Sequence, residues 1–141
     1  MCDGSRLTNP QKALRLFYQS LIQLIHNHRA LYSVDGKLVD LQYANYSFYD
    51  TRRIISFIRY IENAEKLLFV MNFDYQTSFD IELSIPDDVR IRIGLEPTKD
   101  YFLKEVFIDR NLCKKLLWSN TLSLTLPGNQ VYVFQIVEAS E

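Results

Sequence analysis

The chain has 141 residues and a mass of 16.7 kDa, which is the size of one domain. Hydrophobic residues make up 48% and charged residues 23%, which excludes a disordered tail, a collagen-like fibre and a disulfide scaffold. The formal net charge of -1 argues against a nucleic-acid partner, and no apolar run approaches the ~18 residues of a membrane span. The composition leaves the cellular compartment open.

The first predicted element is an amphipathic helix from about Pro10 to Arg29. Thr8 and Asn9 place capping side chains before Pro10, which loses no hydrogen bond at the start of a helix. Apolar residues then recur at spacings of three and four, and so share one face: Leu14, Phe17, Leu21, Leu24 and Ile25. That face has to be buried, either against the rest of this chain or against a neighbouring domain of a larger protein.

The chain after Gly36 reads as short strands separated by turn residues. The segment Phe79–Ile85 alternates apolar and polar residues most regularly, and Leu67–Met71 is continuously apolar, as a strand covered on both faces would be. About eight strands at intervals of roughly 8–12 residues predict a mainly β, antiparallel sandwich or barrel. The segments predicted as strands are Lys37–Tyr43, Arg53–Ile61, Leu67–Met71, Phe79–Ile85, Val89–Leu95, Tyr101–Ile108, Leu112–Trp118, Leu122–Leu126 and Val131–Val137.

The composition changes only near Leu31–Gly36, between the helix and the strands. We therefore predict two units, an N-terminal helical segment over residues 1–33 and a β domain over residues 34–141.

Few residues form a pattern that suggests chemistry. Asp80 and Glu82 share one strand face, but an exposed polar face has nothing to raise the pKa of a carboxyl group, so they are poor candidates for an acid and base pair. His26 and His28 are two apart on a helix and cannot share a metal, and Cys2 and Cys113 have no metal-type spacing. We expect no catalytic residue, metal or cofactor. The basic pairs Arg52-Arg53 and Lys114-Lys115 have no phosphate-binding loop beside them, so they are expected in solvent.

The order of segments resembles the C-terminal end of family 13 glycoside hydrolases, the α-amylase family. The helix resembles the one that ends the catalytic barrel of those enzymes, with Asn9-Pro10 followed by Leu14, Phe17-Tyr18 and Leu21-Ile22. Three strand motifs of the family follow in the same order. They are Ile55–Arg59, Leu67–Phe73 and the closing pair of Leu126–Gly128 and Val131–Phe134. Residues 91–118 match only as generic strands.

This resemblance implies a Greek-key β-sandwich that packs against a catalytic barrel and carries no catalytic residue itself. A barrel takes ~250 residues, more than this whole chain. The family's catalytic segments are missing here, so the implied partner is the catalytic barrel of a parent enzyme that cleaves or rearranges α-glucans such as starch and maltooligosaccharides. The two carboxylates of the double displacement would belong to that barrel.

Two other functions remain open. The aromatic segment from Tyr43 to Tyr49 suggests a carbohydrate-binding module with its own α-glucan affinity, in which Tyr46 and Tyr49 are the candidate contacts. The same rings, and Trp118, would equally suit the sandwich core or an interdomain surface. A free-standing sandwich that binds a protein partner would also account for the apolar helix face.

Overall fold

In the computed structural model, which describes residues 8–109, 111–118 and 121–139, the chain begins with the long helix α1, Asn9–Asn27. The side chain of Thr8 accepts a hydrogen bond from the Gln11 amide, and the Gln11 side chain accepts one from the Thr8 amide, which forms a capping box. The helix was predicted to reach Arg29 but ends two residues earlier, because His28 is extended. The single turn α2, Arg29–Tyr32, follows it.

Six antiparallel strands form the larger sheet, in the order β1-β2-β3-β8-β5-β6. Strand β8 returns from the end of the chain and inserts between β3 and β5, pairing Phe69 with Val133 and Leu103 with Ile136. Neighbouring strands are thus far apart in sequence, as in a Greek-key sandwich. The bounds are β1 Lys37–Asp40, β2 Ile54–Tyr60, β3 Lys66–Asn72, β5 Tyr101–Glu105, β6 Cys113–Leu116 and β8 Val131–Glu138.

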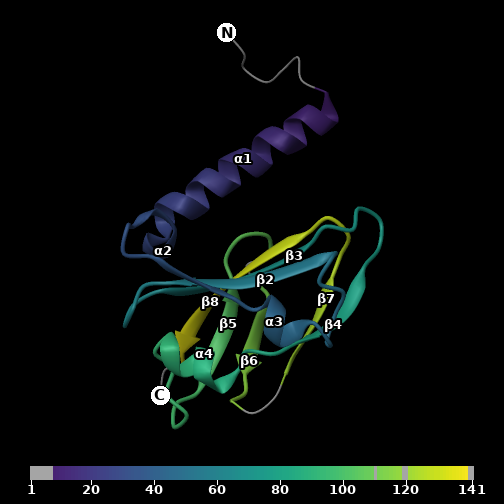
Figure 1. Ribbon diagram of the computed structural model, residues 1–141. Helices are drawn as coiled ribbons and strands as arrows, with labels where there is room; N and C mark the ends of the chain where they lie inside the picture. The colour runs from purple at the N-terminus through teal and green to yellow at the C-terminus, as the bar shows by residue number, and fades with distance from the viewer. Residues whose placement is uncertain (1–7, 110, 119–120, 140–141) are drawn as a thin grey trace.

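Two strands, β4 (Phe79–Leu83) and β7 (Leu122–Leu126), form the second sheet, with Ile81 opposite Leu124. Alternate side chains of both sheets point into the space between them and form the main core, which includes Ile58, Leu68 and Phe134. The predicted fold, an antiparallel sandwich of about eight strands preceded by one amphipathic helix, is therefore confirmed (Figure 1).

The outer face of the larger sheet carries a second, smaller apolar cluster. Leu67, Phe69 and Val133 of β3 and β8 pack there against Leu24 of α1 and Ala30 of α2. Leu67 to Val70 are all buried, so the prediction that this strand is covered on both faces is correct. The two clusters place β3 and β8 at the centre of the molecule.

The predicted strand Val89–Leu95 is wrong, because this segment begins with the short helix α4, Asp87–Arg92. Pro86 precedes the helix, Asp87 and Asp88 occupy its first turn, and Gly94 follows it with a φ of +93°. Val89 and Ile93 are four apart, which is the spacing of one helical face, and both are buried while Ile91 is exposed. Apolar residues that alternate at a spacing of two also include pairs at a spacing of four, such as Val89 and Ile93. The sequence pattern was therefore compatible with a strand and with a helix.

The predicted strand Lys37–Tyr43 is too long, because β1 ends at Asp40 and the turn α3, Gln42–Asn45, follows. The Asp40 carboxylate accepts a hydrogen bond from the Gln42 amide, which starts that turn. Val39 and Leu41 are buried as expected, whereas Tyr43 is directed into solvent. The predicted alternation therefore fails at its last position.

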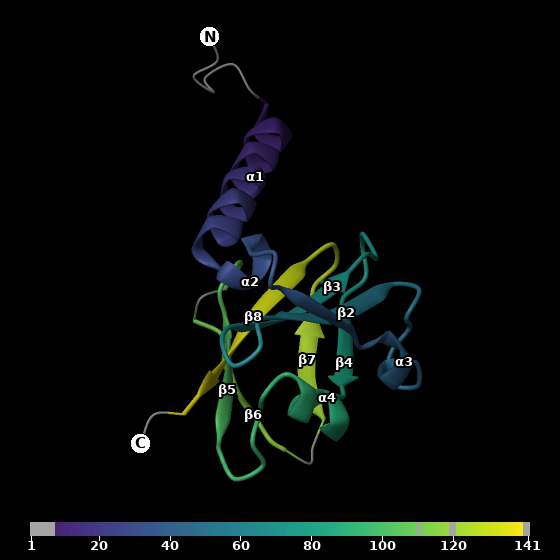
Figure 2. The ribbon, with the colours of Figure 1, turned by 60° about the vertical axis from the view of Figure 1, so that its left-hand side comes forward.

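Helix α1 leans away from the sandwich, as the two views show, and contacts it through its C-terminal half and the ring of Phe17 (Figures 1 and 2). Of the helices in the described ranges, none is both long and apolar enough to cross a membrane. The relation between α1 and the sheet is therefore the feature that bears most on function.

Two isoleucines test the placement of α4. We expect Ile93→Ala to lower the free energy of unfolding by about 2–5 kcal/mol, because Ile93 is fully buried, at 0% exposure. Ile91→Ala is the matched control and should change it by less than ~0.5 kcal/mol, since Ile91 is 62% exposed. Chemical denaturation of both variants measures the difference. Equal losses of unfolding free energy in the two variants would instead indicate a strand at this segment, because both isoleucines would then lie on the same face.

Candidate functional site

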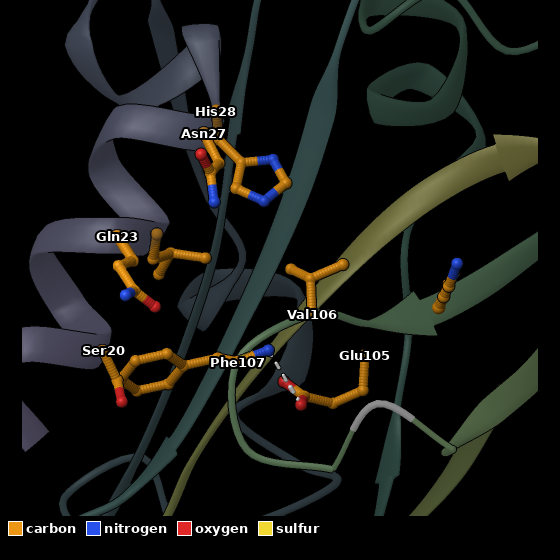
Figure 3. Close-up of a pocket in the computed structure, with 9 residues that line it drawn as sticks. Ser20, Gln23, Asn27, His28, Glu105, Val106 and Phe107 are labelled. Carbon is orange, nitrogen blue, oxygen red and sulfur yellow. Dashed lines mark hydrogen bonds between the residues drawn. The ribbon is translucent and has the colours of Figure 1, made fainter. Parts of the chain in front are cut away.

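A cavity of about 330 Å³ lies where α1 meets the larger sheet. One wall is the polar side of α1, with Ser20, Gln23 and Asn27, and the opposite wall is the end of β5 and the loop after it, with Val106 and Phe107 (Figure 3). The ring of Phe17 meets that of Phe107 edge-on, with centroids 5.7 Å apart. The cavity therefore marks the junction between helix and sandwich.

The buried carboxylate of Glu105, at the back of this cavity, is fully occupied by the backbone. One oxygen accepts hydrogen bonds from the amides of Phe107 (Figure 3), Ile108 and Asp109, and the other accepts one from Val133 at 2.8 Å. A carboxylate with four amide donors closes the β5–β6 loop and ties it to β8. Glu105 is therefore a structural group, buried and held by backbone donors.

A second carboxylate, Glu65, anchors the base of α1. Its Oε2 lies 2.7 Å from Nδ1 of His28, and its Oε1 accepts a hydrogen bond of 3.0 Å from the Ala30 amide. Arg59 of β2 donates from Nε to the Ala30 carbonyl at 2.9 Å, on the other side of the same turn. We call Glu65, His28, Ala30 and Arg59 the helix anchor. It fixes α2 on the outer face of the sheet at the loop between β2 and β3.

Gly36 is required for this close approach. A Cβ atom there would lie 2.7 Å from the Ala30 carbonyl oxygen and 2.8 Å from the Arg59 guanidinium, which is too near for any side chain. The chain can therefore pass from α2 into β1 beside the helix anchor only with glycine at this position.

Most of the apolar face of α1 is left in solvent. Of the five residues predicted to share this face, only Leu24 is buried. Leu14, Phe17 and Ile25 are exposed, and Tyr18 and Ile22 extend the exposed surface. A contiguous exposed apolar surface on a helix marks an interaction site. We call these five exposed residues the apolar face of α1. Of the two alternatives for burying the helix face, the chain's own sandwich buries Leu24 and leaves these five residues exposed.

The structure leaves the candidate acid and base pair on a polar surface. Asp80 and Glu82 lie on β4, where Asp80 accepts a hydrogen bond from the Thr125 hydroxyl, and Glu82 accepts them from Thr121 and Ser123. These hydroxyl donors lower the pKa of Glu82 below its ordinary value. A general acid needs the opposite change.

The two histidines are also separated. His28 is part of the helix anchor, whereas His26 is exposed on α1. Within the described ranges, no three His, Cys, Asp or Glu side chains gather in a way that would hold a metal ion. Cys113 is free and exposed, and Cys2 lies outside the described residues.

The aromatic candidates divide between surface and core. Tyr46 is 73% exposed, whereas Tyr49 is only 9% exposed and its hydroxyl bonds to Gln42 and Ser56. Burial raises the pKa of the Tyr49 phenol. Trp118 packs against the main core, with the Arg90 guanidinium 5.4 Å from its ring centre. Tyr46 and Tyr49 therefore do not face a ligand together.

The basic pairs behave as surface residues. Arg52 and Arg53 both contact Asp50, and Arg53 also lies 3.2 Å from Asp74. Lys115 is exposed, and Lys114 lies beside the polar surface of β4 and β7.

Residues 49–137 match the family model described as alpha amylase, C-terminal all-beta domain. The chain belongs to this family. The match covers strands β2 to β8 and leaves α1, α2, β1 and α3 outside it. A comparison with curated proteins finds no match. The matched region is thus an all-beta C-terminal domain of the kind found in α-amylase-family proteins.

Glu65 and Glu105 were not predicted as important from the sequence. Glu105 carried a signal, because it follows Tyr101 and Leu103 at a spacing of two and so places a charge on the inward face of an apolar strand. Glu65 lies in a polar turn among Glu62, Asn63 and Lys66, and nothing in that pattern separates it from its neighbours.

Removing the Glu65 carboxylate should loosen the base of α1 and leave the sandwich folded. We expect Glu65→Ala to increase hydrogen exchange at the Ala30 amide by about 10- to 100-fold, because a charged acceptor is worth ~1.5–3 kcal/mol. Glu62→Ala is the matched control, since Glu62 is an exposed residue of the same turn that pairs with Lys37 and makes no contact with α2 among the described residues. Unchanged exchange in Glu65→Ala would show that the anchor does not hold the helix.

The pKa of Glu82 provides a test of the polar surface. The pKa is lowered in the folded chain, so the associated stabilisation is present above the unfolded pKa and is lost as the pH falls through the folded pKa. Thr121→Ala removes one donor and should raise the pKa towards its ordinary value. Thr125→Ala, which contacts Asp80 instead, is the control. Carboxyl carbon NMR over a pH titration measures both. A pKa above the ordinary value would restore Glu82 as a candidate acid.

Proposed function

We propose that this chain supports the catalytic barrel of an enzyme that acts on α-glucans such as starch and maltooligosaccharides, and that α1 is the last helix of that barrel. The observation that carries the proposal is the contrast along α1, whose base is fixed by the helix anchor while its apolar face is exposed. A helix built in this way holds a second apolar surface at a defined angle to the sandwich.

The outer helices of a (β/α)₈ barrel have the corresponding requirement. Each one packs an apolar face against the barrel strands and leaves a polar face to solvent. The polar side of α1, with Lys12 and Gln19, would remain in water, and Leu14, Tyr18 and Ile22 would lie against the barrel. In this arrangement residues 1–33 belong structurally to the barrel, and residues 34–141 form the supporting domain.

The carboxyl groups of the sandwich are also consistent with a supporting role. Glu105 and Glu65 are consumed by structural hydrogen bonds, and Glu82 has a lowered pKa. The two carboxylates that a retaining glycosidase needs would come from the barrel, with one of them held protonated. The sandwich would contribute stability and orientation instead of chemistry.

A pair of substitutions on α1 tests whether its apolar face docks on a barrel or stays in solvent. In the 141-residue chain, Leu14→Lys together with Ile22→Lys should change the free energy of unfolding by less than ~0.5 kcal/mol, because both side chains are in solvent. In the product of the whole reading frame that encodes the chain, expected to include the barrel, the same pair should cost about 3–5 kcal/mol, because the charges would be buried without partners. Calorimetry measures the melting temperature in both cases.

Gln19→Lys is the matched control, since Gln19 is an exposed polar residue of the same helix outside its apolar face and should be silent in both proteins. A reading frame without a barrel would overturn the proposal. Equal effects of the lysine pair in the two proteins would do so as well.

A further inference from the structure

Three aromatic side chains around α3 are directed away from the fold. Tyr43 is 90% exposed and Tyr46 is 73% exposed, and Phe48 is also exposed. The rings of Tyr43 and Tyr46 lie side by side, with centroids 6.4 Å apart and planes inclined by 40°. We call Tyr43 and Tyr46 the aromatic platform. It belongs neither to the main core nor to the cluster under α1.

The backbone beneath the platform is held firmly. A helix of four residues has no stability of its own, so its shape must come from tertiary contacts. Asn45, which is fully buried, donates from Nδ2 to the carbonyls of Leu41 and Ser84 and accepts from the Ser84 amide at 2.7 Å. One side-chain amide thus ties α3 to the end of β4.

Gln42 and Tyr49 complete this support. Gln42 donates to the carbonyls of Thr51 and Ile54, and its oxygen accepts from the Ser56 amide and the Tyr49 hydroxyl. Every one of these contacts is made by a side chain directed inward. The outward tyrosines are therefore dispensable for the turn, yet they are presented on a preorganised backbone, which lowers the entropic cost of binding.

The chemistry of the platform selects a neutral, hydroxyl-rich ligand. Tyrosine offers an apolar ring face and a hydroxyl group, which match the C–H face and the hydroxyls of a pyranose ring. The nearest acidic side chain along the chain, Asp40, is occupied by the Gln42 amide. Two rings inclined to each other also suit a curved chain of sugars, as in an α-1,4-glucan, better than the flat ribbon of a β-1,4-glucan.

We propose that the aromatic platform binds an α-1,4-glucan, with Tyr43 and Tyr46 stacking on two sugar units of one chain. The choice of α-glucan rests on the proposed function, whereas the platform itself rests on the exposure and geometry of the rings. The platform is built on the sandwich and not on α1, so a bound glucan chain is held at the surface of the supporting domain.

Binding to the full 141-residue chain tests this inference. In isothermal titration with maltoheptaose, the wild-type chain should bind, and Tyr43→Ala and Tyr46→Ala should each weaken binding about tenfold through loss of one stacked ring. The double variant should show no binding. Tyr75→Ala removes an equally exposed tyrosine from the β3–β4 loop and should bind as the wild type does. Circular dichroism and the melting temperature confirm that each variant is folded.

Cellohexaose provides the linkage control and should bind at least tenfold more weakly than maltoheptaose. The inference is overturned if the wild-type chain does not bind maltoheptaose, if the double variant binds undiminished, or if cellohexaose binds equally well. Self-association that is lost in the double variant, without glucan binding, would assign the rings to a protein contact and also overturn it. None of these results depends on Leu14 and Ile22, so this inference and barrel docking fail separately.

Discussion

The insertion of β8 between β3 and β5 determines the rest of the structure. Without it, β1 to β3 and the β5–β6 hairpin would be separate sheets, because β8 is the strand that both β3 and β5 pair with. The pairing of β3 with β8 joins residues about half the chain apart. The entropy of closing that long loop is therefore lost before the contacts of β8 can stabilise the sheet. The same two central strands, β3 and β8, supply the outer cluster on which α1 and α2 rest. The position of α1 and α2 therefore depends on a strand that follows all the other described strands in chain order.

Buried polar side chains hold the connections that this topology requires. Asn72 at the end of β3 donates to the carbonyls of Thr77, Leu126 and Pro127, which links the larger sheet to the smaller one. Asn45 donates to the Ser84 carbonyl and ties α3 to the end of β4, and Glu105 accepts from backbone amides of the β5–β6 loop and β8. Each satisfies backbone groups that the irregular connections would otherwise leave unpaired. This explains why a chain with several buried polar residues can still be stable, and why those residues are unsuited to catalysis.

The sequence predicted what depends on local periodicity. The capped helix, the alternating strand at β4 and the doubly covered strand at β3 all follow from spacing and burial, and the structure confirms them. The segment at α4 was misread because Val89 and Ile93 fit both periods, and only the contacts with the core decide between them. The roles of Glu65 and Asn45 depend on partners distant in sequence, so no local pattern contains them, whereas the position of Glu105 on the inward face of an apolar strand was a local signal. Tyr49 illustrates the same limit. It shares its aromatic character with Tyr46, yet Gln42 and Ser56 draw its hydroxyl into the interior.

The exposed face of α1 and the exposed platform at α3 point to different roles for two ends of one scaffold. The apolar face of α1 consists mainly of aliphatic residues spread along the helix, which suits a large flat partner that buries the whole surface. The platform has two inclined rings over a turn fixed from below, which suits a narrow ligand that touches little else. Because the sandwich core lies between α1 and α3 and is rigid, a barrel docked on α1 and a glucan chain held at α3 would keep a fixed mutual orientation. A domain without catalytic groups can in this way influence an enzyme, by holding its substrate at a constant position relative to the part that breaks the bond.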